Sequence, residues 1–263
     1  MKILSRNLTA ILLLLVMLAV LSTATFAWYT VINRVSGGSI NFTAAINEGG
    51  GALAIGWKST DTTSFALTFD EPNIDFYPMI PRNMPTIDAT KYQDFVSGNF
   101  NTSNQTKNSL NEWICSVPGQ SISPYICTGT ADSAKQNYFY LINRSDIYNL
   151  EVSAVYDIIG AEINDKLRVA MFVGTTASNQ LFKGIMANNN DIHYGNIVSG
   201  QKVDDILTMP DTYRQTLEIT FPVPKQSFVV VSLVAWLDGA IMTDEDAEQS
   251  VTFGLRFDGI AVG

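Results

Sequence analysis

Residues 227–237 read SFVVVSLVAWL, and this stretch decides the fold class. Valine, phenylalanine and tryptophan favour extended backbone, and a run with almost no polar interruption predicts a central strand covered on both faces. Residues 250–257, SVTFGLRF, alternate instead, with apolar side chains from Val251 to Phe257 on one face and the intervening residues on the other. Such alternation is typical of a half-buried antiparallel strand. The two stretches therefore predict an antiparallel sheet near the C-terminus.

The rest of the chain after residue 30 repeats this pattern. Short runs of β-branched and aromatic residues recur between turn formers, and helix signals are nearly absent. We expect eight further strands, at residues 39–46, 53–57, 65–69, 138–143, 150–159, 167–173, 181–186 and 216–223. About ten strands with polar turns predict an all-β fold. The expected architecture is a two-sheet antiparallel, jelly-roll-like sandwich that forms one domain over residues 28–263.

The strand pattern lapses at about residues 70–136, which we interpret as a long irregular insertion with one short helix. This segment holds both cysteines of the chain, Cys115 and Cys127, with turn formers between them. In an oxidising compartment they would form a disulfide that stabilises the fold by about 3 kcal/mol in the chain-entropy model. The alternative is a pair of reduced thiols in a loop.

The N-terminus has the order of a secretory signal peptide. Two basic residues precede the unbroken apolar run AILLLLVMLAVL at residues 10–21. A helix of that length rises about 18 Å, less than the roughly 30 Å of bilayer hydrocarbon. The small residues Thr25 and Ala27 favour cleavage between Ala27 and Trp28. Residues 1–27 are therefore expected to be a signal peptide or, as the alternative, a retained N-terminal hydrophobic helix.

The composition argues against several classes of function. The formal net charge is −9 and no basic cluster is present, so nucleic acid and anionic lipid surfaces are not expected partners. The single histidine, His193, lies in a turn-rich stretch, and the chain has no GxSxG, HExxH or P-loop motif. We therefore predict no catalytic residues, no enzyme activity and no cofactor. Two carboxylates could meet across a cleft as in glycoside hydrolases, but no motif supports this.

The densest acidic stretch, residues 238–248, links the two C-terminal strands. Its carboxylates Asp238, Asp244 and Asp246 are a candidate calcium loop, because Ca²⁺ accepts oxygen ligands in flexible geometry. Their spacing departs from the EF-hand pattern. A solvated hairpin loop without metal is the preferred interpretation.

The stretch TFAWYT at residues 25–30, followed by SINFTAAI at residues 39–46, resembles the start of exported β-sandwich proteins of the camelysin and TasA type. The C-terminal stretches VVVSLVAWLDG and QSVTFGLRFDGI are similar to the closing strand pair of that family. The resemblance does not extend to residues 70–136. It implies a jelly-roll fold, processing by a SipW-type signal peptidase, and secretion to the cell surface or a biofilm matrix.

The resemblance also implies assembly into fibres. Family members polymerise when an N-terminal segment freed by cleavage completes the sheet of the next subunit, so that an open sheet edge pairs with a supplied strand. The candidate assembly strand here consists of Trp28, Tyr29, Thr30, Val31, Ile32, Asn33, Arg34 and Val35. The expected partners are other copies of the chain, other surface or matrix proteins, and signal peptidase during export. Membrane contact is expected only through the N-terminal segment.

Two alternatives to a secreted fibre subunit stay open. A retained leader would make the protein a membrane-anchored surface domain, or a pilin-like subunit whose apolar helices bundle in a filament core. Jelly-roll sandwiches also present glycan sites, and Phe76, Tyr77 and Trp113 could form an aromatic platform for a carbohydrate-binding module. Aromatic residues in a long insertion more often pack beneath it.

Overall fold

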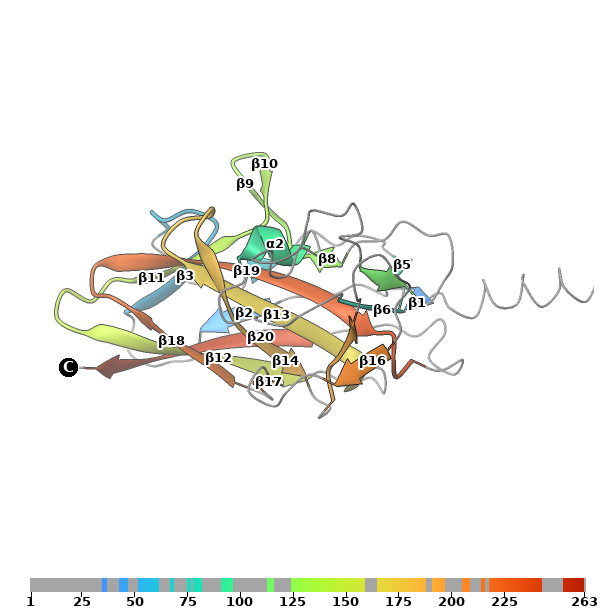
Figure 1. Ribbon diagram of the computed structural model, residues 1–263. Coiled ribbons are helices and arrows are strands. Elements are labelled where there is room, and N and C mark those ends of the chain that lie inside the picture. Colours follow the sequence, from blue (N-terminus) through green and yellow to red (C-terminus); the bar gives the residue numbers. More distant parts are fainter. Residues whose placement is uncertain are drawn as a thin grey trace, which may run out of the picture.

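The fold is all-β, as predicted, with two stacked sheets and, among the described residues, one short helix on the outside (Figure 1). The computed structural model describes residues 35–36, 43–46, 52–61, 67–68, 75–76, 78–81, 91–96, 113–115, 124–158, 165–187, 191–196, 205–208, 214–215, 218–242 and 253–262. The predicted helix within residues 1–27 lies outside this part of the chain.

The small sheet has five strands in the order β18-β12-β20-β2-β4. Their bounds are Glu218–Val223, Asn149–Ile158, Phe253–Val262, Thr43–Ile46 and Leu67–Thr68. β12 and β20 pair antiparallel along their whole length. β2 lies on the other side of β20 and runs parallel to it, from Ala44↔Leu255 to Ile46↔Phe257. The small sheet therefore joins an early strand of the chain to the last one.

The large sheet has nine strands, with β17-β14-β13-β19-β11-β3 as its main path. These are Arg214–Gln215, Gln180–Ala187, Leu167–Gly174, Ser227–Asp238, Phe139–Asn143 and Leu53–Gly56. β19 pairs with β13 on one side. On its other side, three strands pair with successive parts of β19: β11, β8 (Tyr125–Ile126) and β6 (Pro78–Ile80). β6 also pairs with β7 (Ile114–Cys115).

Smaller elements surround the two sheets. β1 (Val35–Ser36) pairs with β5 (Asp75–Phe76), and β9 (Gly129–Ala131) forms a hairpin with β10 (Ala134–Gln136). β15 (His193–Asn196) and β16 (Asp205–Thr208) form a second hairpin. The helix α2 (Tyr92–Val96) lies over the large sheet beside β19 (Figure 1). Each of the ten predicted strands is present with shifted ends, and β20 continues five residues beyond the predicted end at Phe257.

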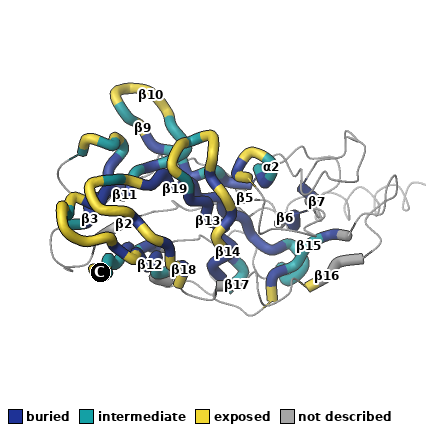
Figure 2. The backbone as a smooth tube through the Cα atoms, turned by 60° about the vertical axis from the view of Figure 1, so that its left-hand side comes forward, coloured by how far each residue is buried: buried dark blue, intermediate teal, exposed yellow. Residues whose placement is uncertain are grey.

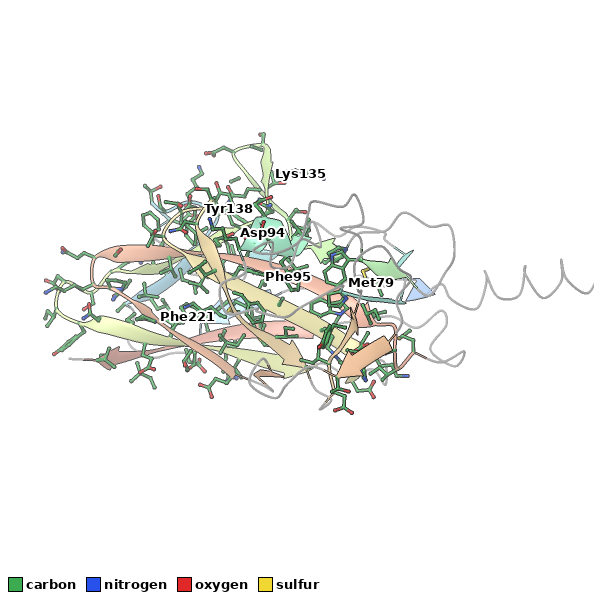
Figure 3. All side chains as sticks on the ribbon, viewed as in Figure 1. Met79, Asp94, Phe95, Lys135, Tyr138 and Phe221 are labelled. Atoms are coloured by element: carbon green, nitrogen blue, oxygen red, sulfur yellow. The ribbon has the colours of Figure 1, made fainter. Side chains whose placement is uncertain are left out.

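Alternating side chains of both sheets meet in an inner core. β18 shows the pattern most simply, because Ile219, Phe221 and Val223 are buried and the residues between them are exposed. Phe221 is labelled in Figure 3. Across the sheets, the rings of Phe139 and Phe257 lie 5.7 Å apart in an edge-to-face arrangement. This packing identifies the two layers as a β-sandwich.

A second apolar cluster lies on the outer face of the large sheet, and we call it the outer cluster. It consists of Met79, Tyr92, Phe95, Trp113, Ala170, Phe172, Phe182, Ile185, Ala187, Ile192, Val234 and Trp236. Its members from β13 and β19 alternate with residues of the inner core, so both strands are buried on both faces (Figure 2). The central position predicted for residues 227–237 is confirmed.

The predicted irregular insertion is partly regular. β6 and β8 extend the large sheet, and α2 contributes Tyr92 and Phe95 to the outer cluster. Trp113 is 6% exposed and packs against Trp236 at 5.2 Å, so it lies beneath the insertion. It cannot serve as an exposed sugar platform. The described parts of the insertion therefore form a third layer over part of the outer face of the large sheet.

Candidate functional site

The last part of β20 presents an open backbone edge. β12 pairs with all ten residues of β20 on one side, whereas β2 on the other side stops at Phe257. Among the described residues, none pairs with residues 258–262 on that second side. Five strand residues extend about 17 Å, which is enough to pair with one more short strand.

β2 is described as far as Ile46, and the next described strand, β3, begins at Leu53 in the large sheet. Gly259 faces the inner core, where an added Cβ would lie 3.3 Å from Leu53 Cδ2. Ile260 points outward and is 65% exposed, beside its cross-strand neighbour Glu151.

The opposite margin of the small sheet differs in chemistry. β18 carries Pro222, which has no backbone N–H to donate, and the exposed Glu218. Proline and charge are the usual means by which edge strands avoid pairing with other chains. The open part of β20 has the sequence DGIAV, whose one charge, Asp258, is paired with Arg256 at 3.1 Å. The β20 edge is therefore the less protected of the two.

The predicted assembly strand lies mostly outside the described residues. Val35 is described, and its backbone pairs with Phe76 in the β1–β5 ladder. The segment from Trp28 to Arg34 and the predicted cleavage site between Ala27 and Trp28 are not described. β1 lies at one end of the sandwich and the C-terminal end of β20 at the other (Figure 1).

The predicted disulfide between Cys115 and Cys127 is not formed, because Cys127 is a buried free thiol. The register gives the reason. Cys127 donates its backbone N–H to Leu233, whereas Cys115 pairs with Met79 in β6, whose own partner is Asp238. At ordinary strand spacings this places the two Cα atoms about 17 Å apart. A disulfide needs about 4.4–6.8 Å.

Cys127 is expected to be unreactive in the folded protein. Burial raises the pKa of its thiol well above the usual range, so little thiolate is available at neutral pH. In a Cys115→Ser variant, dithionitrobenzoate should titrate no thiol in buffer and one thiol in urea. The thermal midpoint of the unmodified protein should not change when a reductant is added. A drop of several degrees would restore the disulfide interpretation.

A buried charge cluster lies at the end of β19. The Arg168 guanidinium and the Asp238 carboxylate are both fully buried, with 3.3 Å between Arg168 Nε and Asp238 Oδ2. His193 donates its backbone N–H to Asp238 Oδ2 at 3.1 Å, and its Nδ1 lies 3.0 Å from the same oxygen. The other carboxylate oxygen accepts the backbone N–H of Ala240 at 3.2 Å. Asp238 thus links β19, β13 and β15.

Arg168 completes the cluster through backbone carbonyls. Its Nη1 donates to Asp165 and Leu167 at 2.7 and 3.0 Å, and its Nη2 donates to Asp191 at 2.6 Å. A buried guanidinium needs such acceptors in addition to its ion pair, because desolvation of the charge is costly. The cluster fixes the segment before β15 to β13.

The buried position of Asp238 bears on the candidate calcium loop. The carboxylate of Asp238 is buried and faces Arg168, so it is not part of a solvated acidic loop. Asp244 and Asp246 lie outside the described residues. Within the described part of the chain, no three His, Cys, Asp or Glu side chains are grouped to hold a metal ion.

The sequence pattern does not predict the contact of His193 with Asp238, because it places His193 only in a turn-rich stretch. Two signals point to the cluster in retrospect. Arg168 interrupts the apolar strand LRVAMFVG, and Asp238 ends the apolar strand SFVVVSLVAWLD. A single charge inside or at the end of a buried strand needs an opposite charge nearby. His193 has no such signal, because it lies in a short turn-rich stretch rather than inside a long apolar strand.

Comparison with known proteins adds no information on function. Among the described residues, no helix has the length and apolar character needed to cross a membrane. Searches against protein-family models, curated proteins and solved structures find no match.

Proposed function

We propose that this chain is an exported structural protein whose subunits join by strand addition at the open edge of β20. Each subunit would donate the segment from Trp28 to Val35 and accept the same segment of a neighbour beside residues 258–262. This is the assembly mode implied by the resemblance to proteins of the camelysin and TasA type. A jelly-roll connection of the two sheets, and a location at the cell surface or in a biofilm matrix, belong to the same proposal.

The observation that carries the proposal is the position of the two ends. β1, at the end of the donor segment, pairs with β5. β5 comes just before β6, and β6 pairs with the end of β19 at Leu237 and Asp238. The open part of β20 lies at the opposite end, where Val262 pairs with Asn149. A donor at one end and an acceptor at the other form a head-to-tail contact. Repetition of such a contact gives an open-ended filament rather than a closed dimer.

The chemistry of the edge suits an added strand. The backbone N–H and C=O groups of residues 258–262 that point away from β12 have no strand partner among the described residues. Ladder hydrogen bonds to such groups give affinity without demanding a particular side chain. The outward Ile260 gives the incoming strand an apolar neighbour, and the donor segment WYTVINRV is rich in β-branched and aromatic residues. The donor segment is therefore long enough to cover the acceptor edge and has the residue types that favour a strand.

Ile260→Lys is expected to abolish filament growth while leaving the monomer folded. A lysine on an edge strand opposes pairing with another chain, and a surface substitution typically changes stability by less than about 0.5 kcal/mol. Negative-stain electron microscopy and sedimentation velocity of the purified mature protein measure assembly. Urea denaturation checks the fold.

Ile147→Lys is the matched control. Ile147 is 64% exposed, the same residue type at nearly the same exposure as Ile260, but it lies in the connection between β11 and β12. This variant should form filaments like the unmodified protein. Deletion of residues 28–35 should give a monomer, and a synthetic peptide with the sequence WYTVINRV should bind that monomer but not its Ile260→Lys form. Normal filaments from Ile260→Lys or from the deletion variant would refute the proposal.

A further inference from the structure

The β15–β16 hairpin is fastened to the sandwich through a short segment, residues 191–195. The Asp191 carbonyl accepts from Arg168, and Gly195 donates its N–H to the Pro81 carbonyl at 2.9 Å. Between them, His193 makes two contacts with Asp238 Oδ2. Ile192, 1% exposed, fills part of the outer cluster beneath the hairpin.

Of these contacts, the one between His193 and Asp238 can change charge near neutral pH. The guanidinium of Arg168 stays protonated at every accessible pH, and backbone carbonyls do not titrate. Histidine is the side chain whose ordinary titration falls in the physiological range. The His193 side chain is 15% exposed and can exchange a proton with solvent, whereas the carboxylate that it contacts is fully buried.

We propose that His193 is a pH-dependent latch that holds the β15–β16 hairpin against the end of β19. In the protonated state, the imidazolium donates a charge-assisted hydrogen bond from Nδ1 to Asp238. In the neutral state the contact is an ordinary hydrogen bond at most, and the hairpin is held by backbone contacts and by Ile192. Raising the pH therefore loosens the hairpin and uncovers the edge of the outer cluster.

The charges around the imidazole decide the direction of the effect. The hydrogen bond to Asp238 is the largest influence and raises the pKa of His193 above its ordinary value of 6.5, with the charge of Asp191 acting in the same direction. Partial burial and the charge of Arg168 oppose it. From the other neighbouring elements, β16 places Thr208 opposite His193, and the segment from Pro78 to Pro81 has no titratable side chain.

The sign of the linkage follows from the raised pKa. The latch contributes its full stability below pH of about 6.5, where the unfolded chain is also protonated. Its contribution is lost as the pH rises through the folded-state pKa of His193. Above that pH the hairpin opens more often, while the ladder between β12 and β20 is unaffected.

The single histidine of the chain makes the test direct. In the full-length protein, the one set of imidazole resonances should titrate with a pKa above 6.5. Hydrogen exchange should show protection factors of the His193 and Gly195 amides falling severalfold across that titration. Protection of Leu141 in β11 should stay constant.

His193→Asn is the matched variant, because its side-chain amide can donate to Asp238 but cannot titrate. Its hairpin protection should be independent of pH. The proposal is overturned if wild-type protection is flat across the histidine titration, or if His193→Asn keeps the wild-type pH dependence. The imidazole titration of the wild-type protein tests the latch without any variant, and a pKa at or below 6.5 also contradicts it.

Discussion

Replacing Asp238 with alanine is expected to lower the free energy of unfolding by about 3–5 kcal/mol, the cost typical of breaking a buried ion pair by removing one partner. The substitution would leave the Arg168 guanidinium fully buried without its carboxylate, and His193 and Ala240 would lose an acceptor. Equilibrium urea denaturation followed by tryptophan fluorescence measures the change, because the buried Trp236 lies two residues from the site.

Asp258→Ala provides the comparison. Asp258 also pairs with an arginine, Arg256, but the two side chains are 31% and 34% exposed. A solvent-screened pair of this kind contributes about 0–1 kcal/mol. Each substitution removes a carboxylate that faces an arginine, so the difference between their costs in unfolding free energy measures the effect of burial. Equal costs for the two substitutions would show that the Arg168–Asp238 pair is hydrated in solution.

Phe95→Ala is expected to cost about 3–5 kcal/mol, as large-to-small substitutions of buried aromatic residues do. Phe95 is fully buried, and its ring lies 5.0 Å from Phe172, 5.5 Å from Trp113 and 5.8 Å from Trp236. Phe95 belongs to α2 and is labelled in Figure 3. Its loss would open a cavity between the insertion and the large sheet. Thermal and urea unfolding of the same variant measure the effect.

Phe228→Ala is the control for this cavity. Phe228 is the second residue of β19, is 36% exposed, and lies 5.2 Å from the ring of Tyr140. We expect it to cost about 1 kcal/mol or less, as for substitutions near the surface. If Phe95→Ala costs no more than Phe228→Ala, the insertion does not pack on the sheet as a third layer.

Hydrophobic periodicity was sufficient to predict the sandwich. In a strand that is buried on one face, such as β18, apolar and polar residues alternate along the sequence. In a strand that is buried on both faces, such as β19, the apolar residues are nearly continuous. The pattern could not predict the layer formed by the insertion. α2 and β6 hold only a few residues each, too short for a periodic signal, and their packing depends on contacts between distant residues such as Phe95 and Trp236.

The site residues were less predictable for a different reason. The open edge of β20 arises from where β2 stops, which is a matter of register between strands far apart in sequence. Cys115 and Cys127 are close in sequence, yet Cys127 follows β8, which pairs with β19, whereas Cys115 is on β7, one strand farther out beside β6. His193 lies in a polar stretch and meets Asp238 only because the β15–β16 hairpin folds onto β19. None of these relations follows from local composition.

The parallel pairing of β2 with β20 has a consequence for how the protein is made. Ala44 and Leu255 are 211 positions apart, so the small sheet cannot close until nearly the whole chain has left the ribosome. Pairing over such a separation is slow, because the entropy of closing the intervening loop must be overcome first. During that delay β2 is an early strand without its final partner. The late arrival of β20 thus leaves the small sheet incomplete until the end of synthesis.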